Sequence, residues 1–584
     1  MQVLTNHLGY PSAGCKKAVF VAEASTKATA FRVLRACGGV VSAGQPVACG
    51  PVAHWGKGDH WTLCFDDVRE EGTYTVEVDT DRGSVRSQAF EVRESLVDLR
   101  LVNAVGYSFK AQRSSGEWSK RDSDIPFAGQ RQGTVDLHGG WYDASGDYGI
   151  HLSHLSHSTY HNPQQAAFTA LMFFRVEELL AQSGIEHFSQ VRRRFLDEAF
   201  FGADFVMRRV APSGSFFRSI GRGDALGRPE QQRNVRFEYH HSSAQFGAAA
   251  TAESETITDD NYEVSLRSGG GTAIAALAAA ARRYYPSMEH GQADYIGAAQ
   301  RAWDVLSTQN ERYTNDGRWN LVDEYCALEA LTELYRTTAM YDYLRQARTM
   351  AERILARIRV LDGAAYLEMD EGKPFHHAAD EGLPVVALLN YVAIETDNAL
   401  AAKALAGARQ LMEGTLARTA AVANPYGYAR LLYRDNDTGE IGTKFFFPHN
   451  SNAKPWWQGD NARIASLACA ALQLAPAVED ELADRLRCFA ADQINWILGL
   501  NPFDACMMEG YGRNNIQYFY NGRYDFLNCP GGICNGITSG LEDEEGIEFV
   551  LEPNERIKDN WRWAEQWIPH GTWFLYALAS RVRR

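Results

Sequence analysis

Residues 272–281 have the sequence TAIAALAAAA, which is apolar on nearly every side of a helix. A helix without a polar face is buried on several sides instead of lying at the surface. The stretch therefore predicts a helix in the inner layer of a large, mainly α protein.

Further Ala- and Leu-rich segments with helical spacing follow one another from residue 96 to the end of the chain. About eleven helices are expected there, because apolar residues recur at the helical period. The expected starting points are Gln164, Phe188, Gly271, Asp294, Glu324, Tyr341, Pro384, Asn398, Asp460, Val478 and Thr572. Their regular return suits hairpins of helices closed into an α/α toroid. An irregular helical bundle fits composition and period equally well.

The first 95 residues have a different pattern. Short alternating or β-branched runs are separated by Gly, Asp and Ser at intervals of about ten residues, which is typical of a β-sandwich. The expected strands are 17–22, 30–34, 61–65, 73–78 and 89–92. We therefore expect a small β-domain at 1–95 and a helical domain at 96–584.

The composition narrows the class of ligand. The chain has 584 residues, 45% hydrophobic and 22% charged residues, and a net charge of -15. The acidic balance argues against a nucleic-acid partner, because phosphate contacts need a basic face. No apolar run of about 18 residues indicates a membrane span. The first residues show no secretory signal, which needs a basic segment followed by an apolar run. An uncharged or cationic ligand fits this chain better.

The number and spacing of the cysteines indicate the redox state of the compartment. There are ten, without a Cys-x-x-Cys pair. This usage favours free thiols in a reducing, cytoplasmic compartment and argues against a zinc site. A pair between Cys529 and Cys534 in an exported protein is the alternative. We expect no metal and no cofactor, and the sequence leaves monomer and homodimer both open.

The most informative loop is 139–149, GGWYDASGDYG. Asp143 and Asp147 are four residues apart among glycines and aromatic residues such as Tyr142. This pattern suits a sugar site, where rings stack on aromatic faces and a carboxylate holds a water. An Asp-rich turn whose side chains bond to their own backbone is the alternative.

This loop resembles the Asp-Ala-Gly-Asp signature of glycoside hydrolase family 9. Two other segments agree: NHLGYP at 6–11 is similar to the start of the immunoglobulin-like domain that often precedes the catalytic domain, and INWILGLNPF at 494–503 resembles a late helix and Asn-Pro turn of the family. The resemblance implies an (α/α)6 barrel preceded by a small immunoglobulin-like β-sandwich. It also implies an inverting β-glycosidase.

The family's acid Glu lies twelve residues before a final Ala-Leu-Ala helix. Here Glu565, in WAEQW at 563–567, has that spacing from 577–579. An apolar setting between tryptophans would raise its pKa. Inversion needs a protonated and an ionised carboxyl group roughly 6.5–9.5 Å apart. By resemblance, Glu565 is the acid, Asp147 the base and Asp143 its helper; spacing does not exclude the reverse order of the two aspartates.

Ser145 separates the aspartates by one residue more than is usual in the family, and the family's His-rich segment is absent. With NPQQ at 162–165 and no export signal, the chain resembles a branch of bacterial exo-β-D-glucosaminidases and cellobiases associated with chitin catabolism. That resemblance implies release of glucosamine, or glucose, from the non-reducing end of a short oligosaccharide. An endo-β-1,4-glucanase and a catalytically silent sugar-binding protein are the alternatives.

Several other residues are candidates for binding sugar. Trp563 flanks Glu565; Glu324 opens a helix, and its alternative role is acid placement at a helix N-terminus. His161 is preferred as a sugar contact to a metal site built from the four nearby histidines. The remaining candidates precede a helix and could instead pack or cap it: His449, Trp456, Trp457 and Asp460.

Overall fold

The computed structural model describes most of the chain. The described residues are 1–94, 96–148, 151–153, 164–183, 189–222, 232–237, 257–314, 316–449, 458–524 and 528–582.

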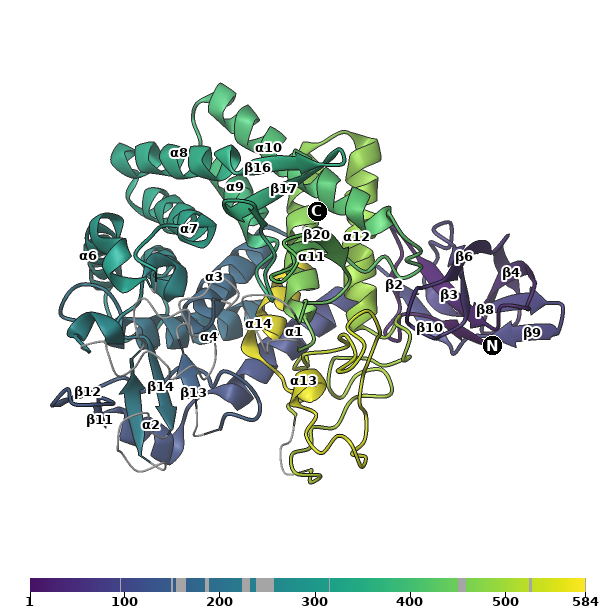
Figure 1. Cartoon of the computed structure of the whole chain (residues 1–584), viewed down its shortest axis with the longest axis horizontal. Coiled ribbons are helices and arrows are strands. Elements are labelled where there is room, and N and C mark those ends of the chain that lie inside the picture. Colours follow the sequence, from purple (N-terminus) through teal and green to yellow (C-terminus); the bar gives the residue numbers. More distant parts are fainter. Residues whose placement is uncertain are drawn as a thin grey trace.

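Two concentric rings of helices form the large domain (Figure 1). In the inner ring each helix packs on the next, and the last packs on the first. The inner helices are α3 (Ala166–Gln182), α5 (Gly271–Ala280), α7 (Leu321–Thr338), α9 (Leu383–Val392), α11 (Asn461–Leu474) and α14 (Ile568–Val582). This closure decides between the two architectures in favour of the (α/α)6 barrel.

Each inner helix packs against an outer one. The outer helices are α1 (Leu96–Gln112), α4 (Ser189–Arg208), α6 (Gln292–Gln309), α8 (Tyr341–Ala356), α10 (Asn398–Ala420) and α12 (Asp480–Ile497). Helix α1 is not expected from the sequence, because polar and small residues such as Asn103, Gly106 and Ser108 interrupt its apolar period. Short hairpins such as β16 (Ile358–Leu361) with β17 (Ala364–Asp370) are not expected either.

The stretch at 272–281 lies in the inner ring as expected, and α5 is buried along its whole length. At Gly271 the helix approaches α7 closely, since a Cβ there would lie 2.6 Å from the backbone oxygen of Cys326. The absence of a side chain at Gly271 therefore allows α5 and α7 to pack closely.

The N-terminal domain is a sandwich of two sheets, with strand orders β1-β3-β7-β6 and β2-β10-β8-β4-β5, and β9 beside β8. The five predicted strands correspond to β3 (Lys17–Ala22), β4 (Ala28–Arg35), β7 (Asp59–Cys64), β8 (Gly72–Thr80) and β10 (Phe90–Arg93). The others were not predicted: β1 (Gln2–Leu4), β2 (Tyr10–Pro11), β5 (Val40–Gly44), β6 (Val47–Pro51) and β9 (Gly83–Arg86).

The segments that carry the family resemblance at the two ends of the chain touch each other. The Asn6 amide donates to Asn495 Oδ1 at 2.8 Å, and the His7 backbone N–H donates to the Leu498 oxygen at 2.9 Å. Gly499 has a φ of 108°, and a Cβ there would lie 2.4 Å from the His7 ring. The late turn is thus shaped to receive the start of the β-domain.

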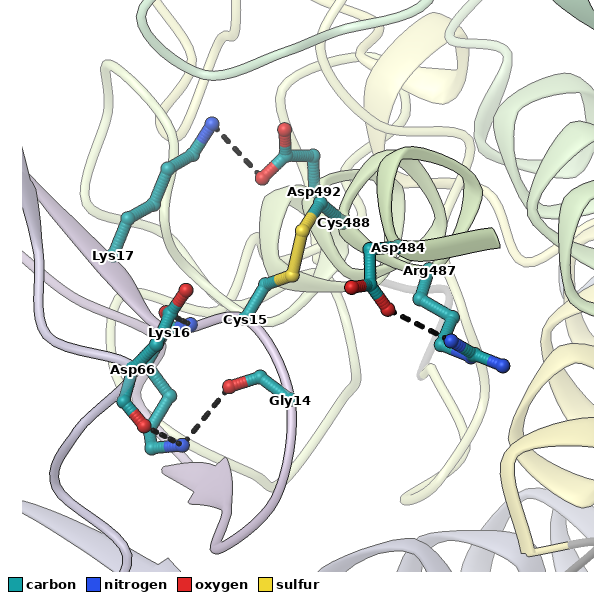
Figure 2. The surroundings of a disulfide bond; sticks show 9 residues. All are labelled: Gly14, Cys15, Lys16, Lys17, Asp66, Asp484, Arg487, Cys488 and Asp492. Carbon is teal, nitrogen blue, oxygen red and sulfur yellow. Dashed lines mark hydrogen bonds and ion pairs between the residues drawn. A yellow bond between two sulfur atoms is a disulfide. The ribbon is translucent and has the colours of Figure 1, made fainter. Parts of the chain in front are cut away.

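A disulfide between Cys15 and Cys488 joins the β-domain to α12 (Figure 2). Nearby, Lys17 pairs with Asp492 of the same helix at 2.8 Å. The prediction of free thiols throughout is therefore wrong. The alternative, a pair between Cys529 and Cys534, does not form either, since both thiols are free. Cys15 and Cys488 are too far apart in sequence to give a recognisable spacing.

None of the described helices is long and apolar enough to cross a membrane.

Breaking this cross-link should destabilise the protein. A disulfide mainly restricts the unfolded chain, so Cys488→Ser should lower the free energy of unfolding by about 2–5 kcal/mol. Calorimetry should show a lower Tm for the variant, and a reductant should lower the Tm of the wild type but not that of Cys488→Ser. Cys529→Ser, which changes a free thiol, is the control. A wild-type Tm indifferent to reductant would contradict the prediction.

Candidate active site

The loop with the paired aspartates and the segment with Glu565 lie side by side. Ala144 and Trp567 form an antiparallel bridge, and the Ile568 backbone N–H donates to the backbone oxygen of Asp143 at 2.9 Å. One segment leads toward α3 and the other into α14, which are neighbours where the inner ring closes. Ring closure therefore brings both predicted parts of the site together.

Ser145 is built into this contact. Its hydroxyl accepts from the Gln566 backbone N–H at 3.0 Å and donates to Asn528 Oδ1 at 2.9 Å. Its own N–H donates to the Gln566 oxygen at 3.2 Å. The residue by which this loop departs from the family pattern thus fixes the loop to the segment of Glu565.

The three carboxyl groups interact electrostatically. Burial raises the pKa of Glu565 to about 7, and the charge of Asp143 adds to the rise. Burial and the charges of Glu565 and Asp143 raise the pKa of Asp147 well above its usual range. Like charges held this close do not all ionise together. At neutral pH the cluster can therefore both donate and accept a proton.

Asp143 has partners that favour its charged form. With the Gln165 amide nitrogen turned toward it, that nitrogen donates to Asp143 Oδ1 at 3.2 Å and Oδ2 at 3.3 Å, while the Gln165 oxygen accepts from Trp567 Nε1 at 3.1 Å. The buried Arg209 guanidinium also interacts with the charge of Asp143. Asp143 thus interacts with both a cation, Arg209, and an amide, Gln165.

A chain of hydrogen bonds holds Glu565. The Asn535 side chain bonds to its carboxyl group and lowers its pKa against the effect of burial. His570 Nδ1 accepts from the Ala462 backbone N–H at 2.7 Å, so His570 Nε2 carries the proton and donates to Asn535 Oδ1 at 2.8 Å. Burial lowers the pKa of His570 to about 3, which keeps the ring neutral. The amide nitrogen of Asn535 is thereby turned away from His570.

Tyr518 also belongs to this cluster. A Cβ at Gly146 would lie 2.8 Å from its hydroxyl oxygen. Burial, then the charges of Glu565 and Asp147, raises the pKa of Tyr518, so it remains a hydroxyl. Gln165, Tyr518, Asn535 and His570 are site residues that the sequence did not predict. No local pattern singles out Tyr518, Asn535 or His570, and Gln165 stands out only as part of the NPQQ segment.

Two predicted sugar contacts beside the carboxylates are buried. Trp563 is 0% exposed, so its indole packs in the interior. Tyr142 is 2% exposed, with its ring 5.4 Å from that of Tyr148 and its hydroxyl 3.3 Å from Ser114 Oγ. Both side chains are packed in this structure, and their contact with sugar stays a prediction.

Two other candidates are held in ion pairs. Glu324 is paired by both oxygens with Arg357, at 2.8 Å for Nη2 to Oε1. Asp460 accepts from Tyr428 and Arg463 and makes no capping bond to α11. The carboxylates of Glu324 and Asp460 are therefore already engaged by protein side chains. Contact of either residue with sugar stays a prediction.

Of the four remaining candidates for sugar binding, only His449 lies within the described residues. His449 Nε2 lies 3.0 Å from Ser539 Oγ, and the His449 backbone N–H donates to Glu544 Oε1 at 2.9 Å. The acidic stretch 542–548 therefore touches a candidate sugar contact. His161, Trp456 and Trp457 lie outside the described residues. Among the described side chains, no cluster of His, Cys, Asp and Glu is arranged to hold a metal ion.

The chain belongs to glycosyl hydrolase family 9, whose model matches residues 100–526. Residues 1–83 match the cellulase N-terminal ig-like domain. Both findings confirm the resemblance drawn from the three motifs. The family match ends before Glu565, so the role of that residue rests on its spacing and its surroundings. A comparison with curated proteins gives no match.

Solved structures share the fold over the whole chain. A metagenome-derived glycoside hydrolase family 9 endoglucanase is 18% identical, with a TM-score of 0.66 over 100% of this chain and 99% of the other. A family 9 protein of Bacteroides ovatus is 18% identical, with a TM-score of 0.65 over 100% and 98%. A mutant of a thermostable endoglucanase from Alicyclobacillus acidocaldarius is 16% identical, with a TM-score of 0.61 over 100% of both chains. At these identities the likeness establishes the architecture alone.

Removing the Asn535 amide should shift the pH profile of hydrolysis. Its hydrogen bond lowers the pKa of Glu565, so Asn535→Ala should raise that pKa above about 7. Because an acid catalyst must be protonated, kcat/KM should fall at a higher pH in the variant than in the wild type. Asn528→Ala is the control, since its amide bonds to the Ala564 oxygen and to Ser145. An unshifted alkaline limb in Asn535→Ala would disprove this role.

Proposed function

We propose that the protein is an inverting, exo-acting β-glycosidase that releases glucosamine, or glucose, from the non-reducing end of short chitosan-type or cello-oligosaccharides. The observation that carries the hydrolytic part is the cluster of Asp143, Asp147 and Glu565 on two bridged segments, with the pKa of Glu565 raised to about 7. Family membership supports hydrolysis of a glycosidic bond.

The surroundings suggest a role for each carboxyl group. Glu565, with a pKa near neutrality, donates a proton to the leaving oxygen. Asp147 removes a proton from the attacking water; the charge of Glu565 raises the pKa of Asp147, so protonation of Glu565 favours the ionised form of Asp147. Asp143, which accepts from Gln165 and interacts with the charge of Arg209, orients that water or the sugar.

The preference for an amino sugar rests on charge. Glucosamine carries an ammonium group near neutral pH, and a carboxylate that stays ionised beside the base can pair with it. Asp143 has such an environment, and Ser145 fixes the position of its loop. The acidic stretch at 542–548, which touches His449, would also attract a cationic oligosaccharide.

One of the two alternatives has specific support. The solved relatives named above as endoglucanases favour an endo-β-1,4-glucanase. A catalytically silent sugar-binding protein would need no proton donor, and the retention of three interacting carboxyl groups disfavours it. The predicted cytoplasmic location stays a prediction, and the Cys15–Cys488 disulfide is unusual for that compartment.

Acid and base variants should respond differently to the leaving group. On natural disaccharides, Glu565→Gln and Asp147→Asn should each lose about 10²–10⁴-fold in kcat. A 2,4-dinitrophenyl glycoside needs no proton on its leaving group, so Glu565→Gln should recover activity and lose the alkaline limb, while Asp147→Asn should stay inactive. Circular dichroism checks the fold. Recovery by Asp147→Asn instead would reverse the assignment.

The substrate preference can be measured with chitosan disaccharide and cellobiose side by side, following the product anomer by NMR. We expect rapid release of α-glucosamine from the β-linked amino sugar. Preference for cellobiose would make the protein a cellobiase with the same mechanism. Cleavage of neither, but of longer cello-oligosaccharides, would support the endoglucanase.

Deleting Ser145 should change the ratio of kcat/KM for glucosaminides to that for glucosides, because it moves one carboxylate relative to the other. Ser145→Ala keeps the loop length and loses only the hydroxyl contacts, so it separates spacing from hydrogen bonding. An unchanged ratio in the deletion variant would show that the extra residue does not set specificity.

A further inference from the structure

Asp380 is a buried carboxyl group that the proposed mechanism does not use. It precedes α9 in the chain and is 0% exposed. Within the described residues it forms no ion pair with Arg or Lys, and its contact with a basic side chain is His377, whose Nε2 lies 4.0 Å from Asp380 Oδ2. Burying a carboxylate without a cation beside it is costly, so the hydrogen bonds that hold this group show what it does.

Acidic residues at the starts of other inner helices are held differently. Each of them pairs with an arginine: Asp323 with Arg267, Glu324 with Arg357, and both Glu381 and Asp460 with Arg463. These pairs balance buried charge locally. Asp380 does not follow this pattern, and the N-cap of α9, Gly382, has no side-chain capping bond either.

The hydrogen bonds of Asp380 reach other helices of the inner ring. The Trp573 Nε1 of α14 donates to Asp380 Oδ1 at 2.8 Å, and the Gln164 backbone N–H donates to Asp380 Oδ2 at 2.9 Å. Both N–H groups favour the ionised carboxylate, whereas burial raises the pKa of Asp380 to about 7. In the ring order α3, α5, α7, α9, α11 and α14, helix α9 stands opposite α3. Asp380 therefore ties the start of α3 to the far side of the ring.

Gln164 is fixed from a second direction as well. Its side-chain Nε2 donates to the Arg267 oxygen at 2.7 Å, and its Oε1 accepts from the Thr272 hydroxyl at 3.0 Å. With its backbone and its side chain both held, Gln164 fixes the start of Gln165, the next residue. The Gln165 amide is the group that donates to Asp143 and accepts from Trp567.

We propose that Asp380 is a positioning residue for the hydrolytic reaction: by holding the Gln164 backbone, it places the Gln165 amide on Asp143. The inference rests on the proposed function, because it gives Asp380 a part in the reaction at the carboxyl cluster. A displacement of about 1 Å far from the reacting atoms is enough to slow an enzyme about a hundredfold.

Indole N–H resonances test this positioning without any substrate. In the full chain labelled with 15N-tryptophan, Asp380→Asn should shift the Trp573 signal, because that indole donates to Asp380. It should also shift the Trp567 signal, because that indole donates to Gln165. Gln165→Ala should shift the Trp567 signal and leave that of Trp573. Spectra are recorded above the pKa of Asp380, and Trp567→Phe and Trp573→Phe assign the two signals. An unmoved Trp567 signal in Asp380→Asn would overturn the proposal.

A double-mutant cycle measures the effect on hydrolysis. Asp380→Asn and Gln165→Ala should each lower kcat/KM about 10–100-fold. If Asp380 acts through Gln165, the double variant should stay within about twofold of Gln165→Ala. Losses that multiply would show that the two residues act independently and would contradict the proposal. A wild type that cleaves no β-glycoside would overturn the proposed function instead, and the resonances would still decide the role of Asp380.

Asp204→Asn is the matched control, because it makes the same change to another buried carboxyl group. Asp204 of α4 accepts from the Tyr295 hydroxyl and from the Glu289 backbone N–H. The control should lower the Tm and leave both indole signals and kcat/KM unchanged. An equal loss of activity in Asp204→Asn would mean that destabilisation alone explains the effect. If Asp380→Asn does not fold, Asp380→Glu keeps the charge, displaces its oxygens by one methylene, and should shift the Trp567 signal too.

Discussion

The contact of α14 with α3 is the constraint on which the rest of the structure depends. It closes the inner ring, and it places the segments that precede the two helices side by side. The bridge between Ala144 and Trp567 and the bonds of Ser145 to Gln566 are consequences of that closure. A barrel that stayed open would expose the facing sides of α3 and α14 and would leave the carboxyl groups apart.

Closing the ring also brings the three carboxyl groups close enough to repel one another, and this repulsion contributes to their raised pKa values. Three carboxyl groups in a partly buried cluster repel one another, and the surrounding residues reduce this cost unequally. Asp143 has Gln165 and the charge of Arg209, whereas Glu565 has a single neutral amide from Asn535. Unequal environments around similar groups separate their proton affinities. The three side chains carry the same chemical group, so it is the residues packed around them that make one carboxyl group a proton donor and another a proton acceptor.

The sequence predicted the architecture better than the site. The apolar stretch at 272–281 indicated an inner helix because burial on all sides leaves a local pattern, and α1 was missed because small and polar residues interrupt its pattern. The three carboxylates were found through resemblance to a family. Asn535, His570 and Tyr518 come from the long C-terminal loop and the last helix, and only the folded chain brings them to Glu565. Trp563, a candidate sugar contact, is fully buried in this structure, and sequence does not distinguish a buried indole from an accessible one.

The disulfide between residues 473 positions apart makes most of the protein one covalent loop. During synthesis the β-domain leaves the ribosome first, and Cys15 must stay unpaired until α12 has been made, so the cross-link is sealed only when the barrel is nearly complete. Afterwards, a single proteolytic cut in any connection between the two cysteines leaves both fragments attached, and they separate only when the disulfide is reduced.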